Sequence, residues 1–71
     1  MNKTDIAKVQ GYLRRTFANT NIRVVARPKK DDSAEVYLGE EFLGTVSEDN
    51  EDGDQSFQFQ MAILDIDLDE A

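Results

Sequence analysis

The stretch SFQFQMAILDIDL, residues 56–68, is the longest apolar run in the sequence and decides the fold that we expect. Its first half alternates with a period of two, which is typical of a strand with one buried face. The phase that should face the core is apolar: Phe57, Phe59, Met61 and Ile63. The opposite phase is polar or small: Ser56, Gln58, Gln60 and Ala62. We therefore expect this strand to form the central wall of a small core.

The alternation changes phase after Ile63. The apolar residues are then Leu64, Ile66 and Leu68, and they alternate with three aspartates, Asp65, Asp67 and Asp69. The segment therefore contains one residue more than a regular strand would carry. This predicts a β-bulge or bend near Ile63–Leu64.

Length and composition predict one small domain over residues 1–71, with residues 69–71 frayed. The chain has no cysteine, which excludes disulfides, thiolate metal sites and cysteine nucleophiles. The absence of cysteine is compatible with a reducing compartment. Histidine, the commonest general base, is also absent. The N-terminal residues MNKTDIAKVQ lack an apolar signal core, and no run has membrane-spanning length. We expect a cytoplasmic protein.

The net charge of −7 is divided unevenly along the chain. Residues 1–30 carry all eight basic residues and one acid, whereas residues 31–71 carry fourteen acids and no base. Such a division is typical of a contact surface or a charged tail. The favoured interpretation is that a basic helix and strand simply lie beside acidic strands and loops, since charge balance bears on solubility and association and not on fold.

The N-terminal segment predicts one amphipathic helix. Thr4 is a plausible N-cap, and the apolar stripe recurs at intervals of three and four residues: Ile6, Val9, Leu13 and Phe17. Gly11 lies in the helix interior, where close packing would explain it. Asn19 and Asn21 fit the end of the helix.

Three further strands are expected before the long one. The first is Ile22–Arg27, which ends at Pro28 because proline cannot donate to the ladder; its inward residues are Ile22, Val24 and Ala26. A charged loop, residues 29–33, leads to a strand whose inner face holds Ala34, Val36 and Leu38. Gly39–Glu41 turns the chain into a third strand, Phe42–Ser47, and residues 48–54 form an acidic loop.

The register of the Gly39–Glu41 hairpin has two solutions. A two-residue turn sets Leu43 opposite Val36. A three-residue connection aligns Leu38 with Phe42, Val36 with Gly44 and Ala34 with Val46. We prefer the second, because it collects more apolar side chains on one face. The meander then pairs Phe42 with Met61 and places Phe59 over Gly44, where an aromatic ring would cover the glycine.

These elements predict an α+β fold, in which one N-terminal amphipathic helix packs on a four-stranded antiparallel β-meander. Two segments, DDSAEVYLGEEFLG (31–44) and EDGDQSFQFQMAILDIDL (51–68), resemble a small alphaproteobacterial family known as domain of unknown function 3126. The resemblance extends over nearly the whole chain, and the second segment is the more distinctive. It implies a short bacterial protein with no assigned activity, and it transfers no catalytic residue.

Neither a metal site nor catalysis is expected. Glu48, Asn50 and Asp52 partly mimic a calcium-binding EF-hand loop, but the twelfth position, which needs a bidentate carboxylate, is Phe59. The carboxylates lie mostly in exposed runs, and a catalytic pair needs a cleft that shifts the pKa of one member. No histidine is available to activate a serine. We therefore expect no cofactor and no enzyme.

Nucleic-acid binding has limited support in the sequence. Arg23 and Arg27 share the outer face of the first strand, and Tyr37 lies opposite Arg23 in the preferred register. A basic sheet face with one aromatic side chain is a weak form of a single-strand binding platform. The same face includes Glu35, and the many acidic residues would repel phosphate. An Arg–Tyr–Glu cluster that packs and pairs locally is the favoured interpretation.

The function that we expect is that of a non-enzymatic interaction module, whose partner is another protein or a second copy. The last strand overhangs its neighbour and has a free outer edge, so its end is the candidate interaction surface: Leu64, Asp65, Ile66, Asp67 and Leu68. These apolar residues would otherwise fold across the open end of the core. A different class of function is an acidic mimic that occupies a basic, nucleic-acid-binding surface of a partner through residues 48–54 and 65–70.

Overall fold

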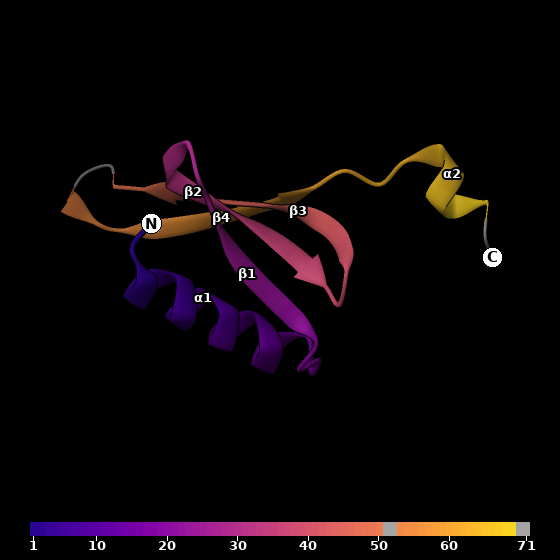
Figure 1. Ribbon diagram of the computed structural model, residues 1–71, viewed down its shortest axis with the longest axis horizontal. Coiled ribbons are helices and arrows are strands. Elements are labelled where there is room, and N and C mark those ends of the chain that lie inside the picture. Colours follow the sequence, from indigo (N-terminus) through magenta and orange to yellow (C-terminus); the bar gives the residue numbers. More distant parts are fainter. Residues whose placement is uncertain (51–52, 70–71) are drawn as a thin grey trace.

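The fold is an N-terminal helix packed on an open, four-stranded antiparallel sheet, as predicted (Figure 1). A computed structural model describes residues 1–50 and 53–69. Its elements are α1 (Lys3–Thr16), β1 (Ile22–Arg27), β2 (Lys30–Leu38), β3 (Glu41–Asp49), β4 (Ser56–Met61) and α2 (Asp65–Leu68). The strand order is β1-β2-β3-β4, so β1 and β4 are the two edges.

Helix α1 begins two residues earlier than predicted. The side chain of Asn2, and not that of Thr4, accepts a hydrogen bond from the backbone N–H of Asp5, at 2.7 Å. The predicted stripe is otherwise confirmed in its middle, because Val9 and Leu13 are buried and Ile6 packs against the core. Phe17 is the C-cap residue and is more than half exposed, so the stripe ends one turn before it.

The α1 C-terminus is closed by a left-handed residue. Ala18 has φ 51°, and its N–H donates to the carbonyl oxygen of Arg15 while that of Asn19 donates to Arg14. These two bonds are the Schellman arrangement, in which glycine is the usual residue at the position of Ala18. Asn19 also accepts a side-chain bond from the N–H of Asn21, at 2.9 Å, so the two asparagines end the helix as predicted.

Strand β2 starts earlier than the sequence indicated. The predicted loop at residues 29–33 is wrong, because only Pro28 and Lys29 turn and Lys30 already pairs with Arg27. The register then shifts between Ala26 and Arg27, which accommodates the extra residues of β2. Ala34 and Val36 are buried and Leu38 packs on the core, as predicted, but Ala26 is exposed because it lies near the edge-strand end.

The β2–β3 hairpin combines the two expected registers. Val36 pairs with Gly44 and Ala34 with Val46, as preferred, but Leu38 pairs with Glu41 and not with Phe42. The turn therefore contains two residues, and Gly39 has the positive φ (62°) that the first position of a type II′ turn requires. A register shift between Val36 and Tyr37 makes the short turn compatible with the apolar register.

The β3–β4 pairing is displaced from the prediction by two residues. Gly44 pairs with Met61 and Val46 with Phe59, so Phe59 does not lie over Gly44 and Phe42 does not pair with Met61. Strand β3 also continues to Asp49, which pairs with Ser56, so the acidic loop is shorter than residues 48–54. Its residues 51 and 52 lie outside the described part of the chain.

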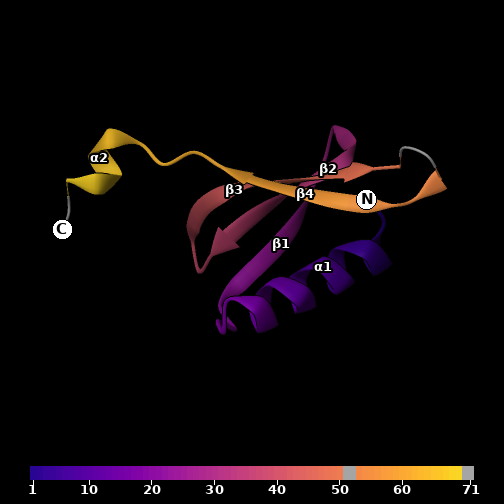
Figure 2. The same ribbon diagram turned by 180° about the vertical axis from the view of Figure 1, so that it is seen from behind.

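Strand β4 ends at Met61, and the predicted bulge at Ile63–Leu64 is wrong. Residues 62–64 have no regular structure, and residues 65–68 form the one-turn helix α2. We name residues 62–69 the C-terminal arm. Figure 2 shows that the arm leads away from the sheet, and the molecule is 43 Å long but 23 Å across in the other two directions. Fraying was predicted for residues 69–71; Asp69 is the C-cap residue of α2, and residues 70 and 71 fall outside the described residues.

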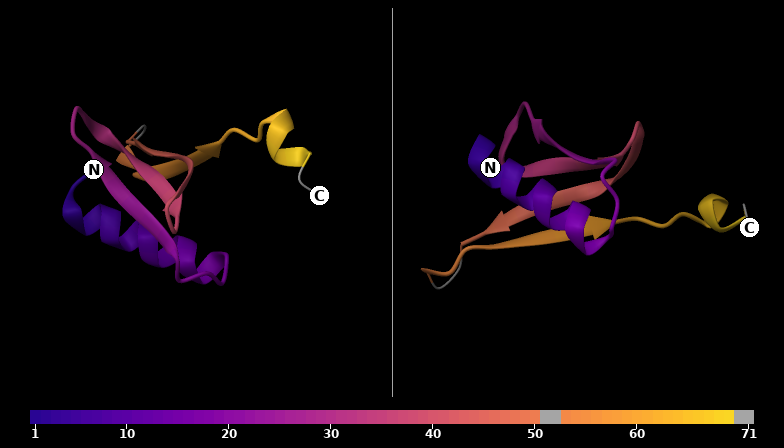
Figure 3. Two further views of the ribbon diagram at one scale, coloured as in Figure 1. Left: turned by 45° about the vertical axis from the view of Figure 1, so that its right-hand side comes forward. Right: turned by 90° about the horizontal axis from the view of Figure 1, so that it is seen from below.

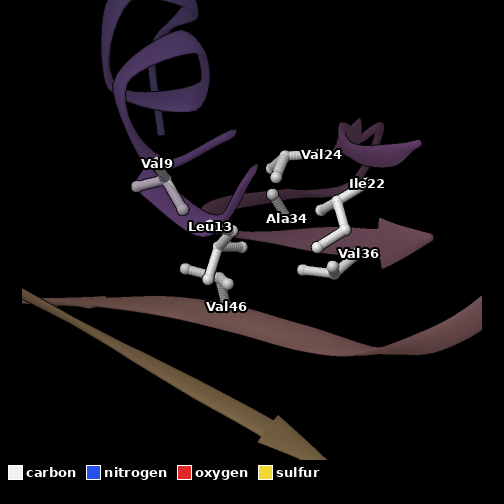
Figure 4. Packing of buried hydrophobic residues seen from close by; sticks show 7 residues of the cluster. All are labelled: Val9, Leu13, Ile22, Val24, Ala34, Val36 and Val46. Atoms are coloured by element: carbon white, nitrogen blue, oxygen red, sulfur yellow. The ribbon is translucent and has the colours of Figure 1, made fainter. Parts of the chain in front are cut away.

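The core lies between α1 and the strands β1, β2 and β3 (Figure 4). Its seven buried hydrophobic residues are Val9, Leu13, Ile22, Val24, Ala34, Val36 and Val46. Within the described residues, β4 contributes none of them, although Phe57 and Phe59 pack against the cluster as predicted. Met61 and Ile63 were expected inside, but they are 47 % and 65 % exposed, since no part of residues 1–50 and 53–69 covers that end of β4.

Candidate interaction surface

Helix α1 is tied to β1, the opposite edge from β4. The Gln10 side-chain oxygen accepts a hydrogen bond from the N–H of Val24 at 3.0 Å, and Arg14 Nε donates to the carbonyl oxygen of Ile22 at 2.8 Å. These side chains satisfy outward backbone groups of an edge strand, which protects β1 from further pairing. Seen from below in Figure 3, β4 runs to one side of α1. The helix therefore leaves the β4 side of the inner face uncovered.

An apolar depression, the α1–β4 groove, follows from this placement. It consists of two adjoining hollows of about 380 and 220 Å³, whose linings share Leu13 and Phe59. Tyr12 and Phe57 line the larger hollow, and Phe17 and Met61 line the smaller one. The groove is therefore bounded by apolar side chains that are more than half exposed on its helix side and partly exposed on its strand side.

The candidate residues of the C-terminal arm lie together, beyond the end of β4. The four large apolar side chains of the arm are 58–68 % exposed: Ile63, Leu64, Ile66 and Leu68. Asp65 and Asp67, which the sequence placed in the same surface, are also exposed. The arm thus presents an unusual density of apolar side chains to solvent on a segment that contributes no buried residue.

Among the described residues, the hydrogen bonds that hold helix α2 are local. The backbone N–H of Leu64 donates to Asp67 Oδ2 at 3.0 Å, and the N–H of Asp67 donates to the carbonyl oxygen of Leu64 at 2.9 Å. No residue of α2 is buried. One turn of helix without tertiary packing is marginal in water. Forming the first turn fixes several backbone dihedral angles, and the loss of conformational entropy outweighs the single hydrogen bond gained. The arm is therefore free to adopt another backbone conformation on contact with a partner.

The second candidate cluster, on the outer face of the sheet, is brought together in part. Arg23 pairs with Tyr37 as predicted, and its guanidinium carbon lies 5.0 Å from the centre of the Tyr37 ring. Arg23 Nε also donates to the carbonyl oxygen of Gly39 at 2.8 Å, and Phe42 meets the Tyr37 ring edge-on at 5.7 Å. These contacts favour the local cluster, because the ring has neighbours where a nucleic-acid base would have to stack.

Arg27 does not join this cluster. Its guanidinium donates to Ser33 Oγ at 3.2 Å, and Ser33 is buried. Tyr37 instead donates its hydroxyl proton to Glu35 Oε1 at 3.0 Å. This hydrogen bond raises the pKa of Tyr37 above its ordinary value, with desolvation and the Glu35 charge acting in the same direction.

The acidic residues near the β3–β4 connection are linked to α1. The Gln55 amide donates to Glu48 Oε1 at 2.7 Å and, at 3.4 Å, to Asp5 Oδ2. Within residues 1–50 and 53–69, no group of three acidic side chains is placed to hold a metal ion. Asp52 of the expected calcium motif is not described, so the absence of a calcium site stays a prediction. The described helices include none that is long and apolar enough to cross a membrane.

Sequence reasoning located the arm and the Arg23–Tyr37 pair but missed the groove. Tyr12 lies next to the apolar stripe of α1, and an aromatic side chain in that position was the available signal. The Tyr12 side chain lines the α1–β4 groove, which exists because α1 packs toward β1. Which strand a helix covers depends on side chains such as Gln10 and Arg14, and hydrophobic periodicity does not report them.

Comparison with known proteins yields one match. A family model described as "Protein of unknown function (DUF3126)" matches residues 5–67, which include the whole sheet and most of the C-terminal arm. Comparison with curated proteins and comparison with solved structures find no match.

Proposed function

This chain belongs to the family described as protein of unknown function DUF3126, and we propose that it acts as a non-enzymatic protein-interaction module that self-associates through its C-terminal arm. The observation that carries the proposal is the arm itself. It holds four large apolar side chains, each more than half exposed, outside the core of its own chain. We place this activity in the cytoplasm, with which a chain that lacks cysteine is compatible.

The energetics support association. Full burial of one leucine or isoleucine side chain contributes about 1.5–3 kcal/mol. A two-fold dimer places two arms, and therefore eight such side chains, in the interface. Their upper limit of about 12–24 kcal/mol is comparable with or larger than the about 4–15 kcal/mol that association costs in lost rigid-body freedom. The apolar side chains of two arms are therefore sufficient to offset that cost.

The chemistry of the described surface supports binding over catalysis. The two hollows of the α1–β4 groove are lined mainly by apolar and aromatic side chains, and Lys8 is the one charged group among them. General acid–base catalysis needs two groups whose environments separate their pKa values. An apolar groove with a single lysine at its margin offers a contact surface for another apolar surface.

The direct test is the molar mass of the wild type and of Ile66→Lys, measured by light scattering over a range of concentrations. We expect the wild type to be a dimer. Ile66→Lys should be a monomer, because it places a charge in the apolar contact. Its thermal unfolding should be close to that of the wild-type monomer, since Ile66 is 68 % exposed in the isolated chain.

Val25→Lys is the matched control. Val25 is also an exposed β-branched residue, and its replacement changes the charge by the same amount, but it lies on β1. We expect Val25→Lys to stay dimeric. A wild type that is monomeric at every concentration would contradict the proposal, and so would an Ile66→Lys protein that keeps the wild-type mass.

A second candidate function, the acidic mimic, draws support from the exposed aspartates of the arm, Asp65, Asp67 and Asp69. A mimic would bind a basic partner through charge, and about 0.5 M salt would screen that attraction. Contact through the apolar side chains would persist at the same salt concentration. A pull-down of partners with and without the salt separates the two functions.

A further inference from the structure

We propose that the partner of the arm is β4 of a second copy. In this pairing the arm of each protomer becomes an extended fifth strand on the β4 edge of the other. The inference rests on the proposed self-association and specifies its geometry. The two copies are related by a two-fold axis near residues 62 and 63, and the segments 56–69 of both chains run antiparallel through the centre of one continuous sheet.

The free edge is the first observation. Gln10 and Arg14 cover backbone groups of β1, so that edge is closed by its own helix. Strand β4 is the other edge, and the sheet has no further strand beyond it in the described residues. The arm continues directly from β4 and leads away from its own sheet (Figure 1). In the proposed two-fold arrangement it extends along the β4 edge of the partner.

The side-chain pattern of the arm is the second observation. In α2, residues two apart point in nearly opposite directions, so Ile66 lies away from Leu68, while Leu64 precedes the helix as its N-cap. In an extended strand the three side chains share one face, and the aspartates between them share the other. The sequence of the arm is therefore that of a strand with one apolar face, although the isolated chain holds it as one turn of helix.

The cross-strand register is the third observation. With the two-fold axis between residues 62 and 63, the inner-face pairs are Phe57 with Leu68, Phe59 with Ile66, and Met61 with Leu64. The outer-face pairs are Ser56 with Asp69, Gln58 with Asp67, and Gln60 with Asp65. Every inner pair is apolar, and every aspartate meets a neutral hydrogen-bond donor and not another charge.

This register also accounts for the change of phase after Ile63. Residues 57, 59 and 61 have one parity and residues 64, 66 and 68 the other, so an irregular segment must join them. Residues 62–64 have no regular structure in the isolated chain. A shift of the pairing by two residues in either direction would leave Phe57 or Leu68 without an apolar partner. The proposed register therefore places all six inner residues in contact.

Engineered cysteines test the register, because the natural chain has none. One chain carries Gln58→Cys and a second, tagged chain carries Asp67→Cys, and the mixture is oxidised mildly. Directly opposite residues of an antiparallel pair have Cα atoms about 4.5–5.5 Å apart, within the about 4.4–6.8 Å of a disulfide. We expect a cross-linked heterodimer in the mixture and little cross-linking in either chain alone.

Matched controls use the neighbouring aspartates. Gln58→Cys is mixed with Asp65→Cys or with Asp69→Cys, which lie two residues to either side of the proposed partner. All four positions are exposed, so the variants are expected to fold. Cross-linking several-fold slower in these mixtures supports the register. Equal yields from all mixtures would overturn it, as would efficient cross-linking of Asp67→Cys with itself.

Two different failures are distinguishable. If Ile66→Lys dissociates the dimer but the Gln58–Asp67 cross-link does not form, the arm is the interaction surface and the β4 pairing is wrong. If Ile66→Lys leaves the mass unchanged, the proposed function and this inference both fail. Backbone chemical shifts of residues 65–68 provide a second readout, since they should change from helical to extended values when the protein dimerises.

Discussion

The backbone carbonyl of Gln60 on β4 occupies the space in which a side chain of Gly44 on β3 would begin. A Cβ atom built on Gly44 would overlap the Gln60 carbonyl oxygen and would lie 2.9 Å from its carbon and from Met61 Cα. Gly44 pairs directly with Met61, at the last pair of the β3–β4 ladder. The glycine therefore permits the close approach of β4, and no aromatic ring is needed to cover it.

We expect Gly44→Ala to destabilise the protein by about 1–3 kcal/mol or more, the range of overpacked sites, because backbone cannot move aside as a side chain can. Urea unfolding measures the loss. Ser47→Ala on the same strand is the control, since Ser47 is exposed and should change stability by about 0.5 kcal/mol or less. Equal effects of the two variants would show that the β3–β4 contact at Gly44 is looser than described.

The order and pairing of the elements could be predicted, because hydrophobic periodicity reports which face of a helix or strand is buried. Val9, Leu13, Val24 and Val36 are core residues for that reason. The bulge in the β2–β3 hairpin could not be predicted. The register shift in this hairpin leaves the alternation of apolar and polar residues in each strand nearly intact. The sequence was therefore compatible both with a two-residue turn and with the pairing of Val36 with Gly44.

Gly11 of α1 has no structural need to be glycine. A Cβ atom there would lie 3.6 Å from the side-chain nitrogen of Arg15, an ordinary contact, so the predicted close packing is wrong. We expect Gly11→Ala to stabilise the protein by about 0.5–1 kcal/mol through helix propensity. Thermal unfolding should show a rise of about 4–8 °C per kcal/mol. Gly39→Ala is the control: Gly39 has a positive φ, so alanine should destabilise there.

Ala18 is the reverse case. Its φ of 51° is a conformation that costs alanine energy and glycine little. We expect Ala18→Gly to stabilise the α1 C-terminus by about 0.5–1 kcal/mol. Ala7→Gly should destabilise by about 1 kcal/mol, because Ala7 lies exposed within the helix. If both substitutions lower the melting temperature equally, Ala18 does not occupy the left-handed region in solution.

We expect the hydrogen bond of the Tyr37 hydroxyl to make the stability of the folded protein depend on pH at high pH. Its pKa in the folded protein is raised above the model-compound value of 10.0, first by the hydrogen bond to Glu35. The contribution of this bond is therefore complete below that ordinary value, and it is lost as pH rises through the higher folded pKa. Ultraviolet titration of the wild type minus Tyr37→Phe isolates the Tyr37 curve. Glu35→Ala should move it down, and an unchanged curve would rule out the Glu35 contact as the cause.

The candidate site could be predicted only in part, from the unusually apolar sequence of the arm. Residues 63–68 have the hydropathy of a core segment, but a single sequence does not show whether the chain can fold back over them. In the structure, pairing with β3 stops at Met61, opposite Gly44, although β3 itself extends to Glu41, and the arm leads away from the sheet from that point. Met61 lies at that boundary, and it looked like a core residue because its phase matches Phe57 and Phe59.

Three aspartate substitutions in β4 separate the fold from the interface. Phe59→Asp should unfold the protein, because Phe59 packs on the core, and removal of a core aromatic ring alone costs about 3–5 kcal/mol, near the whole stability of so small a domain. Met61→Asp should keep the fold, since Met61 is 47 % exposed, but it should lower the dimer fraction by placing a charge opposite Leu64 of the partner. Gln60→Asp, on the outer face, should leave the fold intact and is the control for the fold; it is not a control for the mass, because the proposed register places it opposite Asp65 of the partner. Circular dichroism reports the fold and light scattering the mass; an unfolded Met61→Asp would show that the arm packs over β4 of its own chain.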